Sequence, residues 1–333
     1  MVYNGYTSRN IPSAATFEKV YHTRLLAKQE GDKHTANTLK LILNTTYGAS
    51  LAPTNPLYDP LMGRSVCITG QLYILELAMR YLNACTTVRI IQLNTDGIMI
   101  SLDEDEMPTI YAINDEWQRS KHLLLEEDKI KAIYQKDVNN YIAVYENGKI
   151  KTKGAYVSWG IAPAGAFSIN NNHTIVKKAV VNCFTRNIPV EETIYQSTNI
   201  HEFQIIAKAG GGYDSVYRIP PNYEDIRKSW ERENRFRATT KTGKQTWKTP
   251  PWRWDCYDGP RCEVQKVNRV YASKNPNMGS LVKVKPDGTV GKIAGLPDSC
   301  IIDNKNSLTL DDIDRDWYVA LAKKYISDYT GIT

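Results

Sequence analysis

The 333-residue sequence lacks the features that mark several classes of protein. It has no apolar run of the length, about 18 residues, that a membrane-spanning helix requires, and its first residues do not resemble a secretory signal peptide. Its six cysteines include no pair at the C-x-x-C spacing, so neither a disulfide framework nor a zinc module is favoured. It also contains no internal repeat and no low-complexity tract. These absences argue against membrane insertion and secretion, and they predict a cytoplasmic protein.

The remaining composition is that of an ordinary globular protein, with 42% hydrophobic and 23% charged residues, and the length predicts about two domains. The formal net charge of +6 is modest, but one stretch, residues 223–253, is rich in both cations and aromatic rings. That mixture suits a polyanion with stackable bases, because cations neutralise phosphates and rings offer flat surfaces. A solvated charged face with a few anchoring tryptophans explains the stretch equally well. The residues concerned are Arg227, Lys228, Arg232, Arg235, Arg237, Lys241, Lys244, Lys248 and Arg253, with Trp230, Phe236, Trp247 and Trp252.

Hydrophobic periodicity and the usual start and stop residues predict a chain that combines helices and strands. The expected helices span residues 13–30, 32–47, 65–83, 172–187 and 312–329. The expected strands span residues 87–93, 98–102, 141–146, 149–153, 269–272 and 281–285. Gly31 and Asp32 are expected to end one helix and start the next, which makes the first two helices a hairpin. Asn172 is expected to cap the fourth helix, and Pro189 to interrupt the chain after it.

The most informative segment of the sequence is residues 39–48. On a helix, Lys40, Asn44 and Tyr47 project from one side, beside an apolar stripe formed by Leu39, Ile42 and Leu43. A cation, an amide and a phenol in one row make a polar edge suited to binding. The alternative interpretation is an amphipathic surface helix that ends at Gly48.

Three cations on the expected helical hairpin indicate an anion-binding function. Arg24 and Lys28 lie one turn apart on the first helix, where their repulsion is unfavourable unless an anion lies nearby. Arg24 and Lys40 are each eight residues from Asp32, so they are expected to lie level on the two antiparallel helices. The three side chains therefore have the geometry to converge. Extension of each side chain into water is an equally good explanation.

Two tight turns in the expected strand pairs carry further charged residues. Asn94-Thr95-Asp96-Gly97 joins two β-rich runs, and a hairpin turn of this kind by itself requires no functional explanation for Asp96. In the other hairpin, the returning strand 149–153 places its lysines on one face, and Ile150 and Thr152 on the other. That strand is either an edge strand protected by lysine against aggregation or a strand laid along a phosphate backbone.

Taken in order, these features resemble the polymerase half of a family B DNA polymerase, most like the bacteriophage-type members. The fingers helix of that family carries K-x-x-x-N-x-x-Y-G, which Lys40, Asn44, Tyr47 and Gly48 match without a gap. The preceding fingers helix carries an Arg and a Lys four residues apart, as do Arg24 and Lys28. The resemblance implies that these residues bind the incoming nucleotide, and that Lys40 also takes part in catalysis.

The resemblance extends into the expected strand pairs. The palm turn of the family has the pattern Asp-Thr-Asp, where this chain has Asn94-Thr95-Asp96, and its second Asp is a catalytic metal ligand. Asp96 is accordingly the expected catalytic and magnesium-binding residue. The family also has a Lys and Tyr element, followed by a strand with a Lys-Gly end, that holds primer and template. The residues that resemble this DNA-binding element are Lys136, Tyr141, Lys151, Lys153 and Gly154.

The fold that the resemblance implies is α+β, a fragment of a right-hand polymerase. Residues 1–48 would be a helical-hairpin fingers domain, and residues 49–165 the second part of the palm, an antiparallel sheet with flanking helices. Residues 166–333 would be a mainly helical thumb followed by a mixed C-terminal region. The chain begins just after the place where the family carries its first catalytic Asp. The sugar-screening tyrosine and an exonuclease domain are therefore also expected to lie outside it, on a separate N-terminal polypeptide or in a longer reading frame.

The function implied is that of a component or fragment of a DNA-directed DNA polymerase. Such an enzyme adds deoxynucleotides to a primer 3′ end and uses two Mg²⁺ ions, and its partners are primer-template DNA and deoxynucleoside triphosphates. With one catalytic Asp missing, the chain is expected to be inactive or weakly active alone. A viral protein of this kind would act in the host cytoplasm. Two alternatives are a non-catalytic nucleic-acid-binding protein with a polymerase-like fold and, more remotely, a polymerase that uses ribonucleotides or an RNA template.

Overall fold

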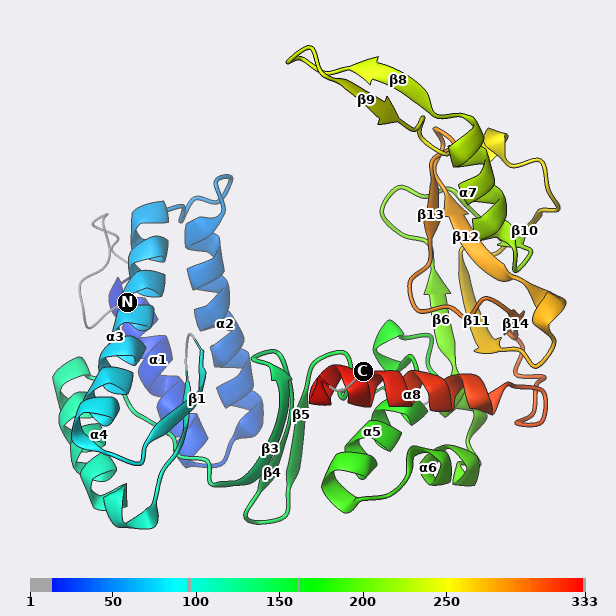
Figure 1. The fold of residues 1–333 in the computed structure, drawn as a ribbon. Coiled ribbons are helices and arrows are strands. Elements are labelled where there is room, and N and C mark those ends of the chain that lie inside the picture. Colours follow the sequence, from blue (N-terminus) through cyan, green and yellow to red (C-terminus); the bar gives the residue numbers. More distant parts are fainter. Residues whose placement is uncertain (1–13, 95–96, 161, 164, 332–333) are drawn as a thin grey trace. The chain divides into compact units, whose positions relative to one another are not determined.

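The structure, a computed structural model, describes residues 14–94, 97–160, 162–163 and 165–331. The chain divides into two compact units, Met1–Asp128 and Lys129–Thr333, and each unit has a hydrophobic core of its own (Figure 1). Both units combine helices with antiparallel strand pairs, which confirms the predicted α+β class. No helix in the described ranges is long and apolar enough to cross a membrane. The division into fingers, palm and thumb remains a prediction.

The first unit consists of a helical hairpin, a second pair of helices and a strand pair. Its elements are α1 Ala14–Gln29, α2 Lys33–Leu51, α3 Pro60–Ala84, β1 Arg89–Leu93, β2 Ile98–Ser101 and α4 Met107–Lys121. β1 and β2 are antiparallel, with a β-bulge between Ile90 and Gln92. They share one core with α3 and α4, formed by Leu77, Tyr81, Cys85, Val88, Ile110 and Trp117. The core therefore fixes the strand pair on the two helices.

The predicted helical hairpin is confirmed, and its second helix is longer than predicted. Gly31 adopts a φ of +78°, and the Asp32 carboxylate accepts a hydrogen bond from the Thr35 backbone N–H at 3.0 Å, which starts α2. α2 continues through Gly48 to Leu51, so the interpretation that Gly48 ends the helix is wrong. The last turn is held by tertiary contact, because Ser50 is fully buried and its carbonyl accepts from the Asp59 N–H.

α3 begins five residues before the predicted start at Ser65, at Pro60. The Asp59 carboxylate accepts a hydrogen bond from the Met62 N–H at 3.0 Å, and Pro60 occupies the first helical position, where its missing N–H costs nothing. The Asp-Pro pair was therefore a usable helix-start signal. The apolar periodicity begins only later in the helix, so a prediction based on it placed the start of α3 too late.

α3 has apolar residues on two faces. One face buries Leu77, Ala78 and Tyr81 against the core. Of the predicted apolar positions Leu72, Leu75, Ala78, Met79 and Leu82, only Ala78 is buried. The others belong to an exposed stripe with alternating spacings of four and three residues, and the exposed fractions of its side chains run from 46% to 57%. We call this the α3 stripe, and its members are Ile68, Leu72, Leu75, Met79 and Leu82.

α4 was not predicted from the sequence. Its residues are mostly polar, and only Ile110 and Trp117, seven positions apart, are buried. Two apolar residues at that spacing give a weak periodic signal, although they are sufficient to pack the helix against α3. The Trp117 indole N–H also donates to the Tyr73 carbonyl of α3 at 3.3 Å.

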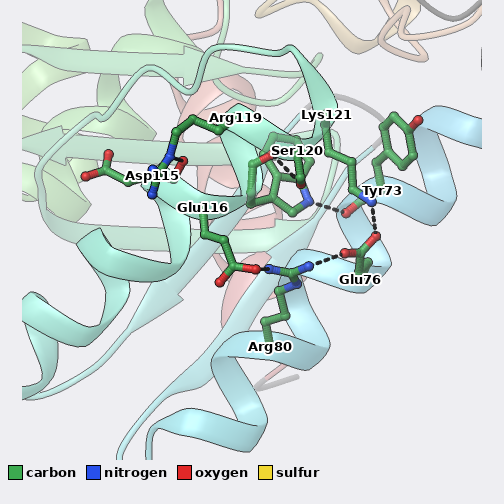
Figure 2. A network of polar contacts seen from close by, with 9 residues as sticks. Tyr73, Glu76, Arg80, Asp115, Glu116, Arg119, Ser120 and Lys121 are labelled. Carbon is green, nitrogen blue, oxygen red and sulfur yellow. Dashed lines mark hydrogen bonds and ion pairs between the residues drawn. The ribbon is translucent and has the colours of Figure 1, made fainter.

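Charged side chains join α3 to α4 beside the core (Figure 2). Glu76 of α3 contacts Arg80 of the same helix at 2.8 Å and Lys121 of α4 at 2.7 Å. Arg80 also reaches Glu116 of α4 at 3.2 Å, and the Lys121 ammonium lies 4.8 Å from the centre of the Tyr73 ring. Because the charges share partners, this network fixes the two helices that support β1 and β2.

The second unit contains three small antiparallel sheets, a separate strand hairpin and four helices among its described residues. The sheet orders are β3-β4-β5, β14-β11-β6 and β10-β7-β12-β13, and the hairpin is β8-β9. Its helices are α5 Thr174–Arg186, α6 Val190–Gln196, α7 Tyr223–Glu233 and α8 Arg315–Thr330. Its strands are β3 Ile130–Asp137, β4 Asn140–Tyr145, β5 Ile150–Lys153, β6 Ile205–Lys208, β7 Ser215–Ile219, β8 Phe236–Thr239, β9 Gln245–Lys248, β10 Cys262–Val264, β11 Val267–Ala272, β12 Ser280–Val284, β13 Val290–Lys292 and β14 Cys300–Ile302.

The main core of the second unit lies where α5, α6 and α8 meet β4 and β11. α8 ends at Thr330, just before Gly331, which has a φ of +67°, and this confirms the predicted end of the helix. Asn172 does not cap α5, contrary to the prediction. Its side-chain oxygen instead accepts from the Ile206 N–H of β6 at 2.8 Å, and His173, with a φ of 51°, occupies the position before the helix. The Asn172 side chain therefore bonds to the backbone of a strand that is distant in sequence, and it is not available to cap α5.

His173 makes the stability of the second unit dependent on pH. It is 7% exposed, and burial, with the charge of Lys177 one turn away, lowers its pKa from 6.5 to about 4. The folded state therefore favours the neutral imidazole, and stability is lost as pH falls from 6.5 to 4 while the unfolded chain takes up a proton. At about 1.4 kcal/mol per pKa unit, we expect a loss of about 3 kcal/mol.

Urea unfolding of the wild type and of His173→Asn at pH 7 and pH 4 measures this loss. Asparagine tolerates the left-handed backbone of position 173 and does not titrate. The variant should therefore lack the His173 contribution but keep the pH dependence that the carboxylates give both proteins. An equal loss in the two proteins would contradict the assignment.

Candidate nucleotide and nucleic-acid site

Arg24 and Lys28 of α1 have the nearby anion that their repulsion requires. The Lys28 ammonium forms an ion pair with the carboxylate of Glu126, in the segment after α4. This hydrogen bond and, more weakly, the charge of Arg24 hold the pKa of Glu126 below its usual value. Arg24 is half-buried, and its Nε atom has no hydrogen-bond partner within the described chain. The two cations therefore form a site for a negatively charged group, and Glu126 supplies that group here.

Lys40, Asn44 and Tyr47 of α2 differ in how firmly they are held. Lys40 and Asn44 are exposed, and within the described ranges Lys40 takes part in no ion pair. Tyr47 is half-buried, and its hydroxyl lies 2.6 Å from the Cys67 sulfur of α3, a contact that raises the pKa of the phenol. The convergence of Lys40 with Arg24 and Lys28 on one anion therefore remains a prediction, whereas the position of Tyr47 is fixed by α3.

The predicted metal ligand Asp96 lies outside the described residues. On either side of residues 95–96, the Asn94 N–H donates to the Gly97 carbonyl at 2.8 Å, and Leu93 pairs with Ile98. In the part of the chain that the structure describes, no three His, Cys, Asp or Glu side chains gather at metal-binding distance. The described residues therefore leave the predicted magnesium site without an observed ligand set.

The sheet β3-β4-β5 brings together several of the predicted DNA-binding residues. Tyr141 of β4 lies opposite Lys153 of β5, whose ammonium is 5.9 Å from the centre of the tyrosine ring. Lys151 lies opposite Ala143, on the same face as Lys153 and Tyr141. Ile150 packs against the main core on the other face. The predicted separation of lysines from apolar residues on this strand is therefore confirmed.

The strand β5 lies at the edge of its sheet and exposes Lys151 and Lys153, and Lys149, just before the strand, is also exposed. This geometry is compatible with both interpretations of its lysines, protection of an edge strand and contact with a phosphate backbone. Tyr145 is nevertheless only 9% exposed, because the side chains around it, including that of Lys149 at 5.8 Å from its ring centre, cover it. The face is thus cationic at its surface and aromatic beneath.

Lys136 has different neighbours from Tyr141. It lies at a register shift between Gln135 and Asp137 of β3. Its ammonium is 5.0 Å from the ring centre of Tyr156 and 3.8 Å from the Asp137 carboxylate. The resemblance placed Lys136 and Tyr141 in one element, but the cation near the Tyr141 ring is Lys153 and the ring near the Lys136 ammonium is Tyr156.

Gly154, the last residue of the predicted DNA-binding element, is required by close packing. It has a φ of +101°, and a Cβ atom there would lie 2.1 Å from the Asn140 side-chain oxygen and 2.4 Å from the Asn139 carbonyl oxygen. The glycine therefore lets the end of β5 approach the β3–β4 turn, which places Lys153 beside Tyr141.

Two residues of these sites, Glu126 and Tyr145, were not singled out from the sequence. The partner of Glu126, Lys28, is 98 residues away, a separation that no local pattern encodes. Tyr145 could have been found, since alternation along the predicted hairpin places it on the face of Tyr141 and Lys153.

Comparisons with known proteins show similarity at the level of fold. No family model matches the chain, and no curated protein matches it. Among solved structures, it is similar to the family B DNA polymerase from the hyperthermophilic archaeon Pyrobaculum calidifontis, with a TM-score of 0.51 and 11% sequence identity. The match covers 98% of this chain and 39% of that chain. The protein therefore has a polymerase-like α+β fold and spans well under half the length of that polymerase.

Proposed function

We propose that this chain is a component or fragment of a template-directed DNA polymerase, of the bacteriophage type that its motifs resemble. The observation that carries the proposal is the α1–α2 hairpin. It presents Arg24, Lys28, Lys40, Asn44 and Tyr47 in the order of the fingers motifs, within a fold similar to that of a family B polymerase. In this proposal α1 and α2 are fingers, α3, α4 and the small sheets through β5 are palm, and the remainder is thumb and C-terminal region. The enzyme would act in the cytoplasm, in the host cell if it is viral.

The residues of the hairpin would have distinct roles in binding a deoxynucleoside triphosphate. Arg24, Lys28 and Lys40 would neutralise the phosphates and the leaving pyrophosphate, as cations do in phosphoryl transfer. Tyr47, held by its contact with Cys67, would offer a fixed ring beside the new base pair, with Asn44 next to it.

In this proposal the chemical step uses two carboxylates. When bound, Mg²⁺ would lower the pKa of the primer hydroxyl and hold the triphosphate, and its binding would need both carboxylates. Asp96 would supply one of these. In this proposal the other comes from a separate N-terminal polymerase or exonuclease polypeptide, or from a preceding segment. Primer extension by this chain alone should therefore be near background.

The alternative is a non-catalytic nucleic-acid-binding protein, and the presence of Asn94 where the family pattern has Asp favours it. Calorimetric titration with Mg²⁺, a deoxynucleotide and primed template separates the two. The polymerase proposal expects nucleotide binding that depends on Mg²⁺ and on the template. Binding of DNA with no metal-dependent nucleotide binding would overturn the proposal in favour of the alternative.

The ion pair between Lys28 and Glu126 should compete with a bound triphosphate. Because both side chains are more than half exposed, the pair contributes about 1 kcal/mol or less, so a triphosphate can displace it. We expect Glu126→Gln to raise affinity for a deoxynucleotide up to about fivefold, since 1.4 kcal/mol is tenfold. The matched control is Glu127→Gln, because Glu127 accepts from the Tyr111 hydroxyl and contacts no cation among the described residues. Calorimetry should show no gain for the control; unchanged or lower affinity in Glu126→Gln would contradict the role.

Lys151 and Lys153 are expected to bind the phosphate backbone of duplex DNA. Replacing both with alanine should weaken duplex binding equally for all sequences, and it should reduce the slope of log affinity against log salt by about one for each phosphate that the protein no longer neutralises. Fluorescence anisotropy with two unrelated duplexes over a range of salt measures both effects. A changed sequence preference, or an unchanged slope, would show that the lysines only protect an edge strand.

A further inference from the structure

The β8–β9 hairpin is a two-stranded element without a core of its own. Every residue from 234 to 249 is exposed or half-exposed, and the hairpin projects from the second unit beyond α7 (Figure 1). Phe236 pairs with Lys248, and Arg237 with Trp247. An isolated pair of strands is marginally stable in water, so its folding alone does not explain why the chain maintains it.

The root of the hairpin is anchored on both sides. Trp252, four residues after β9, is buried, and its indole N–H donates to the Tyr223 hydroxyl of α7 at 2.7 Å. The ring of Trp230, at the other end of α7, lies 5.0 Å from that of Trp252. Trp230 and Trp252 therefore act as anchors, as expected if the stretch 223–253 is a solvated charged face with a few anchoring tryptophans. They fix the position from which the strands project.

The hairpin itself carries only positive charge. No Asp or Glu occurs between Glu233 and Asp255. Within the described part of the chain, none of the five basic side chains of the hairpin joins an ion pair. These residues are Arg235, Arg237, Lys241, Lys244 and Lys248. Their positive charge is therefore available to an external anion.

One face of the hairpin combines this charge with an exposed aromatic ring. The guanidinium groups of Arg235 and Arg237 lie 5.6 Å and 5.3 Å from the ring centre of Trp247, which is 57% exposed. The indole thus has two planar cations close to it. An indole ring can stack on an unpaired base, while guanidinium groups pair with phosphate oxygens.

We propose that the β8–β9 hairpin binds single-stranded nucleic acid. A base stacks on Trp247, and Arg235 and Arg237 contact the phosphates on either side. A single strand fits better than a duplex, because bases in a duplex are already stacked on their neighbours. A membrane surface fits less well. Phe236 and Trp247 point to opposite faces of the hairpin, so no single apolar face is available for insertion.

This site extends the proposed function, because it adds a single-strand contact to the duplex contacts of β5. It does not depend on nucleotide transfer, so the two proposals can fail separately. If the protein showed no metal-dependent nucleotide binding, the polymerase proposal would be overturned, but the proposal for the hairpin would still stand.

The test uses the full chain and a fluorescein-labelled oligothymidylate, with a labelled duplex for comparison. Stacking contributes about 1–3 kcal/mol per base, so we expect Trp247→Ala to lower single-strand affinity about tenfold. Duplex affinity should change less than twofold. Trp247→Phe keeps a flat ring and should retain most of the affinity. The matched control, Thr239→Ala, changes the same face without removing a ring or a charge and should have no effect.

A second variant guards against local misfolding. Replacing residues 235–248 with a short Gly-Ser linker should leave the second unit folded, because Trp230, Trp252 and Tyr223 anchor both ends outside the deletion. It should lose single-strand binding to at least the same extent as Trp247→Ala. Unchanged single-strand affinity in both variants, or equal losses for single strand and duplex, would overturn the proposal. Tighter binding of the wild type to anionic phospholipid vesicles than to the oligonucleotide would also overturn it.

Discussion

Replacing Gly154 with alanine is expected to destabilise the second unit by about 3 kcal/mol, through backbone strain combined with a steric clash. The added Cβ would lie 2.4 Å from the Asn139 carbonyl oxygen, and backbone atoms there have little freedom to move. The Asp137 carboxylate fixes that turn by accepting from the Asn139 N–H at 2.8 Å and from the Asn140 amide at 2.9 Å. Relief of the clash would therefore separate β5 from the turn and shift Lys153.

Gly148→Ala is the matched control, because Gly148 has a φ of +79° in the β4–β5 turn and a Cβ there would meet nothing within 4 Å. The free energy of unfolding of that variant should fall by only about 1 kcal/mol, the cost of placing alanine in the left-handed conformation. Urea unfolding gives both values, and anisotropy with a DNA duplex should show weaker binding for Gly154→Ala alone. Similar stability losses in the two variants would mean that the approach of Asn139 and Asn140 is not a tight constraint.

Asp96→Ala is expected to abolish metal-dependent nucleotide binding. Mg²⁺ retains several waters and uses one or two carboxylates together with substrate phosphates, so removing the carboxylate that the motif supplies should leave it no firm protein ligand. Calorimetric titration with Mg²⁺ and a deoxynucleotide on primed template measures this loss. DNA binding without nucleotide should be unchanged, because Lys151 and Lys153 remain in place.

Asp103→Ala is the matched control for that experiment. Asp103 is an exposed carboxylate shortly after β2, and its side chain makes no capping hydrogen bond. Removing this carboxylate changes the local charge by the same amount as Asp96→Ala does, and it should leave nucleotide binding intact. If Asp96→Ala binds nucleotide and Mg²⁺ as the wild type does, the chain is better described as a nucleic-acid-binding protein that has kept the fold without the reaction.

Local signals in the sequence predicted the elements that local interactions determine. Gly31 and Asp32 placed the α1–α2 turn, and Gly331 placed the end of α8, because a left-handed glycine and a capping carboxylate act within one helical turn. Strands β1, β2, β4 and β5 followed from alternation and tight turns. β3 was not predicted from the sequence, although Ile130, Ala132 and Tyr134 alternate.

Tertiary contacts determined what the sequence could not predict. The last turn of α2 depends on burial of Ser50, and Asn172 serves β6 because Ile206 lies beside it. In the candidate sites, Tyr141 and Lys153 were correctly predicted to belong to one element, because the short turn of a hairpin fixes the register of its two strands. The pairing of Lys28 with Glu126 had no such local basis, because α4 and the strand pair lie between them in the sequence.

The α3 stripe has a thermodynamic consequence. Apolar side chains in water increase the heat capacity of the solution, and covering them lowers it. Any molecule that binds over Leu72, Leu75 and Met79 should therefore produce a binding enthalpy that becomes more negative as temperature rises. A ligand held only by the charged residues of α1 and α2 should show a much weaker trend, so measurements at several temperatures can tell which part of the first unit a ligand occupies.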